Sequence, residues 1–330
     1  MKLMKIISIC CFLLFLAGCS NKEDKTSKPT PVTTIVGKIE NPGDYLIEFV
    51  VHDSITIVDL NEDNTFTFST NKIVRSGEIE FIHQQHSGSL YVIPGTQLTF
   101  NTDNNLFYAN AKFEGPAANY NHYLFKKVLI QQSSENLQTL YSNSEQDFLD
   151  KINQLKNYKL QLLYSFKGVF TDEDYFKMEE GNILYEWANQ LMSYGNMHAM
   201  LLNEPTYETG DSLKRLLNAI PLEKPELLNS YRYVNFVFDH ITQKVNESLA
   251  SVTIPTDQIV KVMLDTSVEK TNQLIGNQEI KRRIVTEFVN QYYLDMNEAD
   301  RAEAIQQYQQ YLSLDNVERL KKTAKELSVD

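Results

Sequence analysis

The sequence predicts an α+β protein in which an N-terminal antiparallel β-sandwich or partly open barrel precedes an all-helical domain of stacked helical hairpins. Two observations carry this prediction. Over residues 32–115, short runs rich in Val, Ile, Thr and Phe alternate with turn residues, as in an all-β domain. Over residues 116–330, apolar residues recur with the 3.6-residue period of amphipathic helices.

Eight runs in the first region have the composition of strands. Gly37 lies inside the first run and predicts a bulge there. Asn41-Pro42-Gly43-Asp44 has the composition of a turn between the first two strands. We expect strands over 33–39, 45–51, 54–60, 65–69, 78–83, 90–93, 96–100 and 107–113.

Helix signals follow from residue 116 onward. Pro116 suits the first turn of a helix, Ser144 and Asp147 form a capping box for a second, and Thr171 with Asp174 caps a third. A short helix at 212–219 and a long one opened by Pro225 come next. The remaining helices are expected over 256–272, 278–296, 298–312 and 316–328, with Asn297 and Asp315 as caps.

The first 19 residues predict a lipoprotein signal peptide. Two lysines precede an apolar run that is too short to span a bilayer, and Leu16-Ala17-Gly18-Cys19 closes it with small residues before a cysteine. Cys19 is therefore expected to carry lipid and to anchor the chain in a membrane. Residues 20–31 are polar with two prolines, and we expect a disordered tether.

Composition excludes several kinds of chemistry. The three cysteines are Cys10, Cys11 and Cys19, so a chain cleaved before Cys19 and lipidated there has no thiol for redox catalysis, disulfides or metal binding. The 31 Lys and Arg residues against 43 Asp and Glu give a net charge of −12, which argues against nucleic acid as a partner. No cofactor motif is present, and we expect no cofactor and no enzymatic activity.

One pair of histidines has a spacing that could bind a metal ion. His83 and His86 lie three residues apart with Glu80 nearby, but side chains at that spacing on one strand point to opposite faces. Gln84, Gln85 and the small residues after them instead favour a hairpin tip. We therefore predict no metal site.

Carboxylate and aromatic clusters on the helices also have ordinary explanations. The acidic residues at 172–174 suit a helix N-terminus. The pair Glu179-Glu180 has the residue types of general acid–base catalysis, which we do not expect without a cleft that raises a pKa. The two aromatic clusters have helical spacing, which is typical of core residues, with a sugar- or peptide-binding groove as the alternative. They are Tyr231, Tyr233, Phe236 and Phe238 in the first cluster and Tyr292, Tyr293, Tyr308 and Tyr311 in the second.

Three segments together resemble a known N-terminal region. They are 35–39, the strand–turn–strand run 90–100 with its Pro94-Gly95 turn, and the junction Phe113-x-Gly115-x-x-Ala118-x-x-Asn121-x-Tyr123-Leu124. The region over about 32–125 is similar to that of Bacteroidetes TlpA-type, thioredoxin-like disulfide reductase lipoproteins. In that family a thioredoxin domain with Trp-Cys-x-x-Cys follows the helices. This sequence has no such motif, so no catalytic residue is carried over, and we expect either a stand-alone accessory protein or a truncated reductase.

The same resemblance gives the charged run Lys22-Glu23-Asp24 a reading. In such lipoproteins, a lysine and acidic residues just after the lipidated cysteine resemble a surface-export signal, and the alternative is an ordinary charged linker. We expect an outer-membrane lipoprotein on the periplasmic side or the cell surface.

Two functions remain open from sequence. The first is a non-catalytic envelope lipoprotein that binds or scaffolds a peptide, protein or glycan. The second is the recognition half of a disulfide reductase system, whose thioredoxin-like partner is absent or supplied by another chain.

Overall fold

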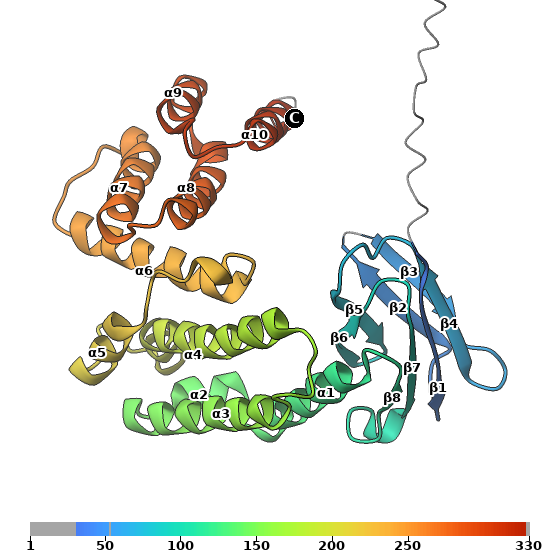
Figure 1. The fold of residues 1–330 in the computed structure, drawn as a ribbon. Coiled ribbons are helices and arrows are strands. Elements are labelled where there is room, and N and C mark those ends of the chain that lie inside the picture. Colours follow the sequence, from blue (N-terminus) through green and yellow to red (C-terminus); the bar gives the residue numbers. More distant parts are fainter. Residues whose placement is uncertain (1–30, 53, 328–330) are drawn as a thin grey trace, which may run out of the picture.

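The computed structural model of the chain describes residues 31–52 and 54–327, and it has the α+β architecture that the sequence predicts. Eight strands come first in this part of the chain and helices follow (Figure 1). The secondary structure changes between Glu114, where β8 ends, and Ala118, where α1 begins.

The strands form two four-stranded sheets. Sheet A has the order β4-β1-β7-β8 and sheet B has the order β3-β2-β5-β6. Their bounds are β1 (Thr33–Glu40), β2 (Leu46–Val51), β3 (Ser54–Asp59), β4 (Thr65–Thr70), β5 (Gly77–His83), β6 (His86–Val92), β7 (Gln97–Asp103) and β8 (Lys112–Glu114).

The two sheets pack face to face, so the β region is a sandwich rather than a barrel. Phe49 of sheet B stacks on Phe68 of sheet A, with ring centroids 4.4 Å apart. Phe81 of sheet B lies 5.9 Å from Phe100 of sheet A. Aromatic side chains from the two inner faces thus fill the interior.

One strand pair departs from the expected antiparallel arrangement. Strands β1 and β7 run parallel, from Thr34 opposite Gln97 to Glu40 opposite Asp103. The chain leaves sheet A after β1 and returns on one side of β1 as the antiparallel β4. After β5 and β6 of sheet B, it enters on the other side of β1 as the parallel β7. This pairing joins segments about sixty residues apart, and local sequence patterns carry no information about it.

The predicted bulge at Gly37 is wrong. Pairing with β4 continues through Gly37 opposite Phe66 without an extra residue. The glycine is instead required by a close approach, because a Cβ atom there would lie 1.7 Å from the carbonyl oxygen of Phe100.

The predicted strand over 107–113 is also wrong in extent, since β8 covers Lys112–Glu114 alone. The Asp103 side chain accepts a hydrogen bond from the Asn105 amide and starts a short 3-10 helix, η1 (Asn104–Leu106). This cap turns the chain out of the sheet before Phe107, although Phe107 itself is buried.

The helices follow as a stack (Figure 1), in which α3 and α4 pair as an antiparallel hairpin through contacts from Phe148 with Tyr194 to Tyr164 with Glu180. The α-helices are α1 (Ala118–Ser133), α2 (Leu137–Ser142), α3 (Glu145–Ser165), α4 (Glu173–Leu202), α5 (Asp211–Ala219), α6 (Tyr231–Leu249), α7 (Ile259–Leu274), α8 (Gln278–Tyr292), α9 (Glu298–Tyr308) and α10 (Leu314–Leu327). Short 3-10 turns are η2 (Pro225–Leu227), η3 (Thr256–Gln258) and η4 (Tyr293–Asp295).

Helix caps follow the sequence in part. Ser144 accepts a hydrogen bond from the Asp147 amide and Asn297 accepts one from the Asp300 amide, so both predicted caps are confirmed. Two caps shift: Asp172 rather than Thr171 begins α4, and Ser313 rather than Asp315 accepts the Asn316 amide at the start of α10. Pro225 opens η2, and α6 begins only six residues later, at Tyr231.

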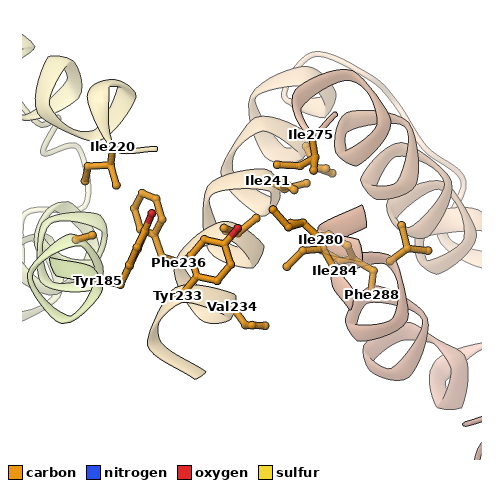
Figure 2. Packing of buried hydrophobic residues seen from close by; sticks show 14 of the residues in the cluster. Tyr185, Ile220, Tyr233, Val234, Phe236, Ile241, Ile275, Ile280, Ile284 and Phe288 are labelled. Carbon is orange, nitrogen blue, oxygen red and sulfur yellow. The ribbon is translucent and has the colours of Figure 1, made fainter. Parts of the chain in front are cut away.

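Two hydrophobic cores organise the described chain. The core of the sandwich continues past the strands into α1 through Tyr123 and Leu124 and reaches Ile183 of α4. The second core joins helices from α2 to α10, and Figure 2 shows its centre, where Tyr185 of α4 meets Tyr233 and Phe236 of α6. Because α4 contributes to both cores, it fixes the sandwich against the helical stack.

Candidate functional site

A cleft separates the outer face of sheet B from α1, α4 and the start of α6. It consists of two adjoining hollows of about 610 and 680 Å³, and we call them together the interdomain cleft. This size is typical of sites that accept small ligands. The residues that line both hollows are Glu78, Glu80, Met178, Glu179, Asn182 and Asn229.

Sheet B supplies the first wall of the interdomain cleft, the sheet wall. Along β5, Ile79 and Phe81 point into the sandwich, so the alternating Glu78 and Glu80 stand on the outer face. Both carboxylates are exposed, and Glu80 lies opposite Ser89 of β6. The strand pattern therefore places two carboxylates side by side, facing the helices.

An ion pair on the facing helices lies at the base of the second wall, the helical wall. Lys127 Nζ of α1 lies 2.6 Å from Glu179 Oε1 of α4, and the Glu179 side chain is only 2% exposed. Tyr123 Oη donates to the same oxygen at 2.7 Å, and Asn182 Nδ2 donates to Oε2 at 3.2 Å. Both oxygens of the buried carboxylate are thus satisfied.

Electrostatics keeps this pair ionised. Burial by itself would raise the pKa of Glu179, but the charge of Lys127 and three hydrogen bonds outweigh it and lower the pKa below its usual value. Burial would likewise lower the pKa of Lys127, but the charges of Glu179 and Glu78 outweigh it and raise the pKa. Glu78, on the sheet wall, is therefore near enough to act on Lys127.

The start of α6 completes the helical wall. Ser230 caps the helix by accepting the Tyr233 amide, and its hydroxyl donates to Asn182 Oδ1 at 2.6 Å. This pair of bonds fixes the first turn of α6 against α4. Tyr231 follows the cap and is 63% exposed, and the Arg232 guanidinium lies 4.9 Å from its ring centroid.

Arg232 is only loosely paired. Its Nε lies 3.9 Å from Glu186 Oε2, while Lys159 donates to Oε1 of the same carboxylate at 2.8 Å. No hydrogen bond joins the guanidinium to any other side chain in 31–52 or 54–327. Arg232 lines the cleft with most of its five N–H donors available to a ligand.

Two tyrosines link the walls. Tyr91 of β6 donates to Asp172 Oδ2 at 2.9 Å, and Tyr175 of α4 lies with its hydroxyl 3.4 Å from Glu78 Oε1. The two rings meet edge to face at 4.8 Å. Burial raises the pKa of Tyr175 well above its usual value, so at neutral pH its hydroxyl keeps its proton and acts as a donor.

The sites predicted at the N-terminus lie outside the described residues. These are Cys19 and the run Lys22-Glu23-Asp24. Within the described part of the chain, no helix has the length and apolar composition needed to cross a membrane.

The histidine pair is a hairpin tip, as the sequence predicts. His83 and His86 face each other across the two-residue turn Gln84-Gln85. The His83 ring is buried between two backbone carbonyls, with Nδ1 2.8 Å from Leu46 O and Nε2 3.0 Å from Pro42 O. The His86 ring stacks on Phe107, and its Nε2 lies 3.2 Å from Asn104 O. Across residues 31–52 and 54–327, no group of three or more His, Cys, Asp or Glu side chains is arranged to hold a metal ion.

Sequence reasoning missed the residues that matter most in the cleft, namely Lys127, Glu179 and Arg232. The sequence assigns no site to the acidic pair at 179–180, and in the structure Glu179 is buried while Glu180 is not. One signal was available: Glu179 stands four residues before Ile183, on the apolar stripe of its helix, where a carboxylate needs a partner.

Comparison with known proteins adds no relative from which a function could be transferred: no protein-family model, no curated protein and no solved structure matches this chain.

Proposed function

We propose that this chain is a ligand-binding module of the cell envelope and that its ligand occupies the interdomain cleft. The observation that carries the proposal is the cleft itself, whose two adjoining hollows share six lining residues and are walled by both the strand region and the helical region. The tight Lys127–Glu179 pair and the Ser230–Asn182 bond hold the helical wall in place before a ligand arrives.

The envelope location rests on the N-terminal sequence. The lipobox ending at Cys19 and the polar tether after it support an outer-membrane lipoprotein, held by lipid with its folded part outside the bilayer. The resemblance of residues 32–125 to the N-terminal region of TlpA-type lipoproteins supports the same compartment. The alternative, that the chain presents substrate to a thioredoxin-like partner, assigns a protein rather than a small ligand to this surface.

Hydrogen exchange measured by mass spectrometry on the full-length protein in detergent tests the proposal. The probes are a mixture of short peptides, a mixture of neutral oligosaccharides and a purified thioredoxin. A ligand in the cleft should protect segments 77–92 and 229–234 and leave α9 unchanged. Protection by thioredoxin alone would favour the accessory function instead.

A blocking variant makes the test specific. Asn229 is exposed, lines both hollows and has no hydrogen bond to another described residue, so Asn229→Trp should fill the cleft and abolish protection. Gln306→Trp places the same side chain on the exposed face of α9 as a control. Equal protection in the wild-type and Asn229→Trp proteins, or protection of neither segment by any probe, would overturn the proposal.

A further inference from the structure

In the hollow of about 610 Å³, the two walls of the interdomain cleft carry opposite charge. On the sheet wall, Glu78 and Glu80 form no ion pair with any described residue, and Glu78 has only the distant Tyr175 hydroxyl as a donor. Among residues 31–52 and 54–327, neither carboxylate thus has a cation within ion-pair distance, although the charge of Glu78 raises the pKa of Lys127. A ligand group that approaches this wall meets two free anions.

In the hollow of about 610 Å³, Lys127 and Arg232 of the helical wall face one lining carboxylate, Glu179, which leaves a surplus of one positive charge. Arg75, Asp172 and Asp174 line the other hollow, of about 680 Å³. Lys127, Lys159 and Arg232 face two carboxylates, Glu179 and Glu186. Lys127 and Lys159 take one carboxylate each at 2.6 and 2.8 Å, which leaves Arg232 at 3.9 Å as the cation without a close partner. Arg232 also presents the planar donor fork that matches a carboxylate.

We propose that the interdomain cleft binds a short peptide with free ends, its terminal carboxylate at Arg232 and its terminal ammonium at Glu78 and Glu80. The inference rests on the proposed function and names the ligand class for the same site. A peptide of this kind carries both charges that the walls leave unmatched. Its amide groups can then bond to Asn182, Ser89 and Asn229, which line the same hollow.

Other ligand classes leave a charge unmatched. A neutral oligosaccharide would cover Arg232 and both glutamates without an ionic partner for either, and the lost hydration of those charges disfavours this. A phosphate-bearing ligand would pair with Arg232 but meet repulsion from Glu78 and Glu80. A polyamine would pair with Glu78 and Glu80 but would be repelled by Arg232.

Apparent Kd values of the full-length protein in detergent, from thermal-shift titrations, test the inference. The probes are one random tripeptide mixture in three forms, namely free-ended, N-acetylated and C-amidated, together with maltotriose. The free-ended form should bind tightest, and blocking either end should weaken binding by about tenfold or more, because each block removes a charge-assisted hydrogen bond.

Two variants assign each end to its wall. Arg232→Gln should remove the difference between the free-ended and C-amidated forms and keep the difference made by N-acetylation. The double variant Glu78→Gln with Glu80→Gln should remove the difference between the free-ended and N-acetylated forms and keep the difference made by C-amidation. Arg215→Gln on α5 and Glu62→Gln in the turn before β4 change the same charges at exposed positions away from the cleft, and both should bind like the wild type.

The outcomes distinguish failure of the peptide-binding inference from failure of the proposed ligand-binding function. Cleft protection by maltotriose with no preference for free-ended peptides would overturn this inference and leave the proposed function standing. Equal affinity for all three peptide forms would overturn the inference as well. If none of the four probes shifts the melting temperature or protects the cleft, both the inference and the proposed function fail.

Discussion

Lys127 Nζ and Glu179 Oε1, 2.6 Å apart, join two helices that belong to different parts of the molecule. The first helix, α1, packs into the core of the sandwich, whereas α4 extends from that core into the core of the helical stack. The pair therefore lies at the junction of the two cores, at the base of the helical wall.

Removing the lysine should leave a buried carboxylate without its counter-charge. We expect Lys127→Met to reduce the free energy of unfolding by about 3 kcal/mol, measured by urea denaturation. Adding Glu179→Gln should recover much of this loss, because the uncompensated charge disappears. Lys322→Met breaks an exposed pair at 3.9 Å and should change stability by less than about 0.5 kcal/mol. Equal effects of Lys127→Met and Lys322→Met would contradict the burial argument.

The same pair should give a defined acid dependence. The pKa of Glu179 in the folded protein lies below the unfolded value of 4.5, so between these values the unfolded chain binds more protons. The stabilisation is present above the unfolded pKa and is lost as pH falls through the folded pKa. We therefore compare the free energy of unfolding of the wild type with that of the double variant Lys127→Met, Glu179→Gln. The difference between them should be constant above about pH 6 and should shrink below about pH 4.5. Urea midpoints from pH 3.5 to 7 measure this, and a gap that widens in acid would refute it.

Two glycines in strands should respond differently to the same substitution. A Cβ at Gly37 would lie 1.7 Å from the Phe100 carbonyl oxygen, whereas one at Gly77 would meet nothing within 4 Å. We expect Gly37→Ala to reduce the free energy of unfolding by about 3 kcal/mol or more, since the parallel β1–β7 pair must separate. Gly77→Ala should change it by less than about 1 kcal/mol. Similar denaturation midpoints for the two variants would contradict this prediction. They would show that β1 and β7 can move apart at Gly37 and Phe100 with little loss of stability.

A buried histidine on α6 should limit stability. His240 is 6% exposed, its Nδ1 has no hydrogen-bond partner among the described residues, and burial, followed by the charge of Lys244, lowers its pKa below 6.5. His240→Leu should therefore raise the free energy of unfolding by about 1 kcal/mol at pH 8.

The gain from His240→Leu should grow as pH falls below about 6.5, because the unfolded wild-type chain then takes up a proton that the folded protein resists. Thermal denaturation at pH 8 and pH 5.5 compares the two conditions. A gain that disappears at the lower pH would mean that the ring finds a partner when it is charged.

The proposed lipid anchor requires the sulfur of Cys19. Cys19→Ala should block processing before residue 19 and prevent acylation, so the protein should keep its leader or leave the membrane fraction. Intact-mass measurement and membrane fractionation report both effects. Ser20→Ala changes the next residue and should be processed normally. Unchanged mature mass and membrane association in Cys19→Ala would exclude the lipoprotein assignment.

The sequence predicted most elements of the fold because their signals are local. The alternation of Glu78 and Glu80 with Ile79 and Phe81 identifies both a strand and its buried face. The parallel β1–β7 pair and the true length of β8 were not predictable in this way. The first depends on the order of strands in space, and the second depends on a side-chain cap at Asp103.

The cleft could not be predicted from local sequence patterns either, because it depends on tertiary structure. Glu78, Lys127 and Arg232 are separated by about fifty and a hundred residues along the chain, and only the tertiary structure brings them to one hollow. Nothing in the spacing of three charged residues on three elements distinguishes them from a solvated surface. Of the residues of the helical wall, only Glu179 could be recognised from the sequence, because it lies on the apolar stripe of its helix.

The position of β1 in the middle of sheet A has a mechanical consequence. If Cys19 carries lipid as proposed, a pull from the membrane would reach the described structure through β1, its first strand, and would act along the axis of that strand. Its two neighbours, β4 and β7, hold it along nearly its whole length, over Thr33–Lys38 and Thr34–Glu40. A load in this direction shears both ladders at once instead of peeling hydrogen bonds away singly. Two ladders together would therefore oppose the extraction of β1 by such a load.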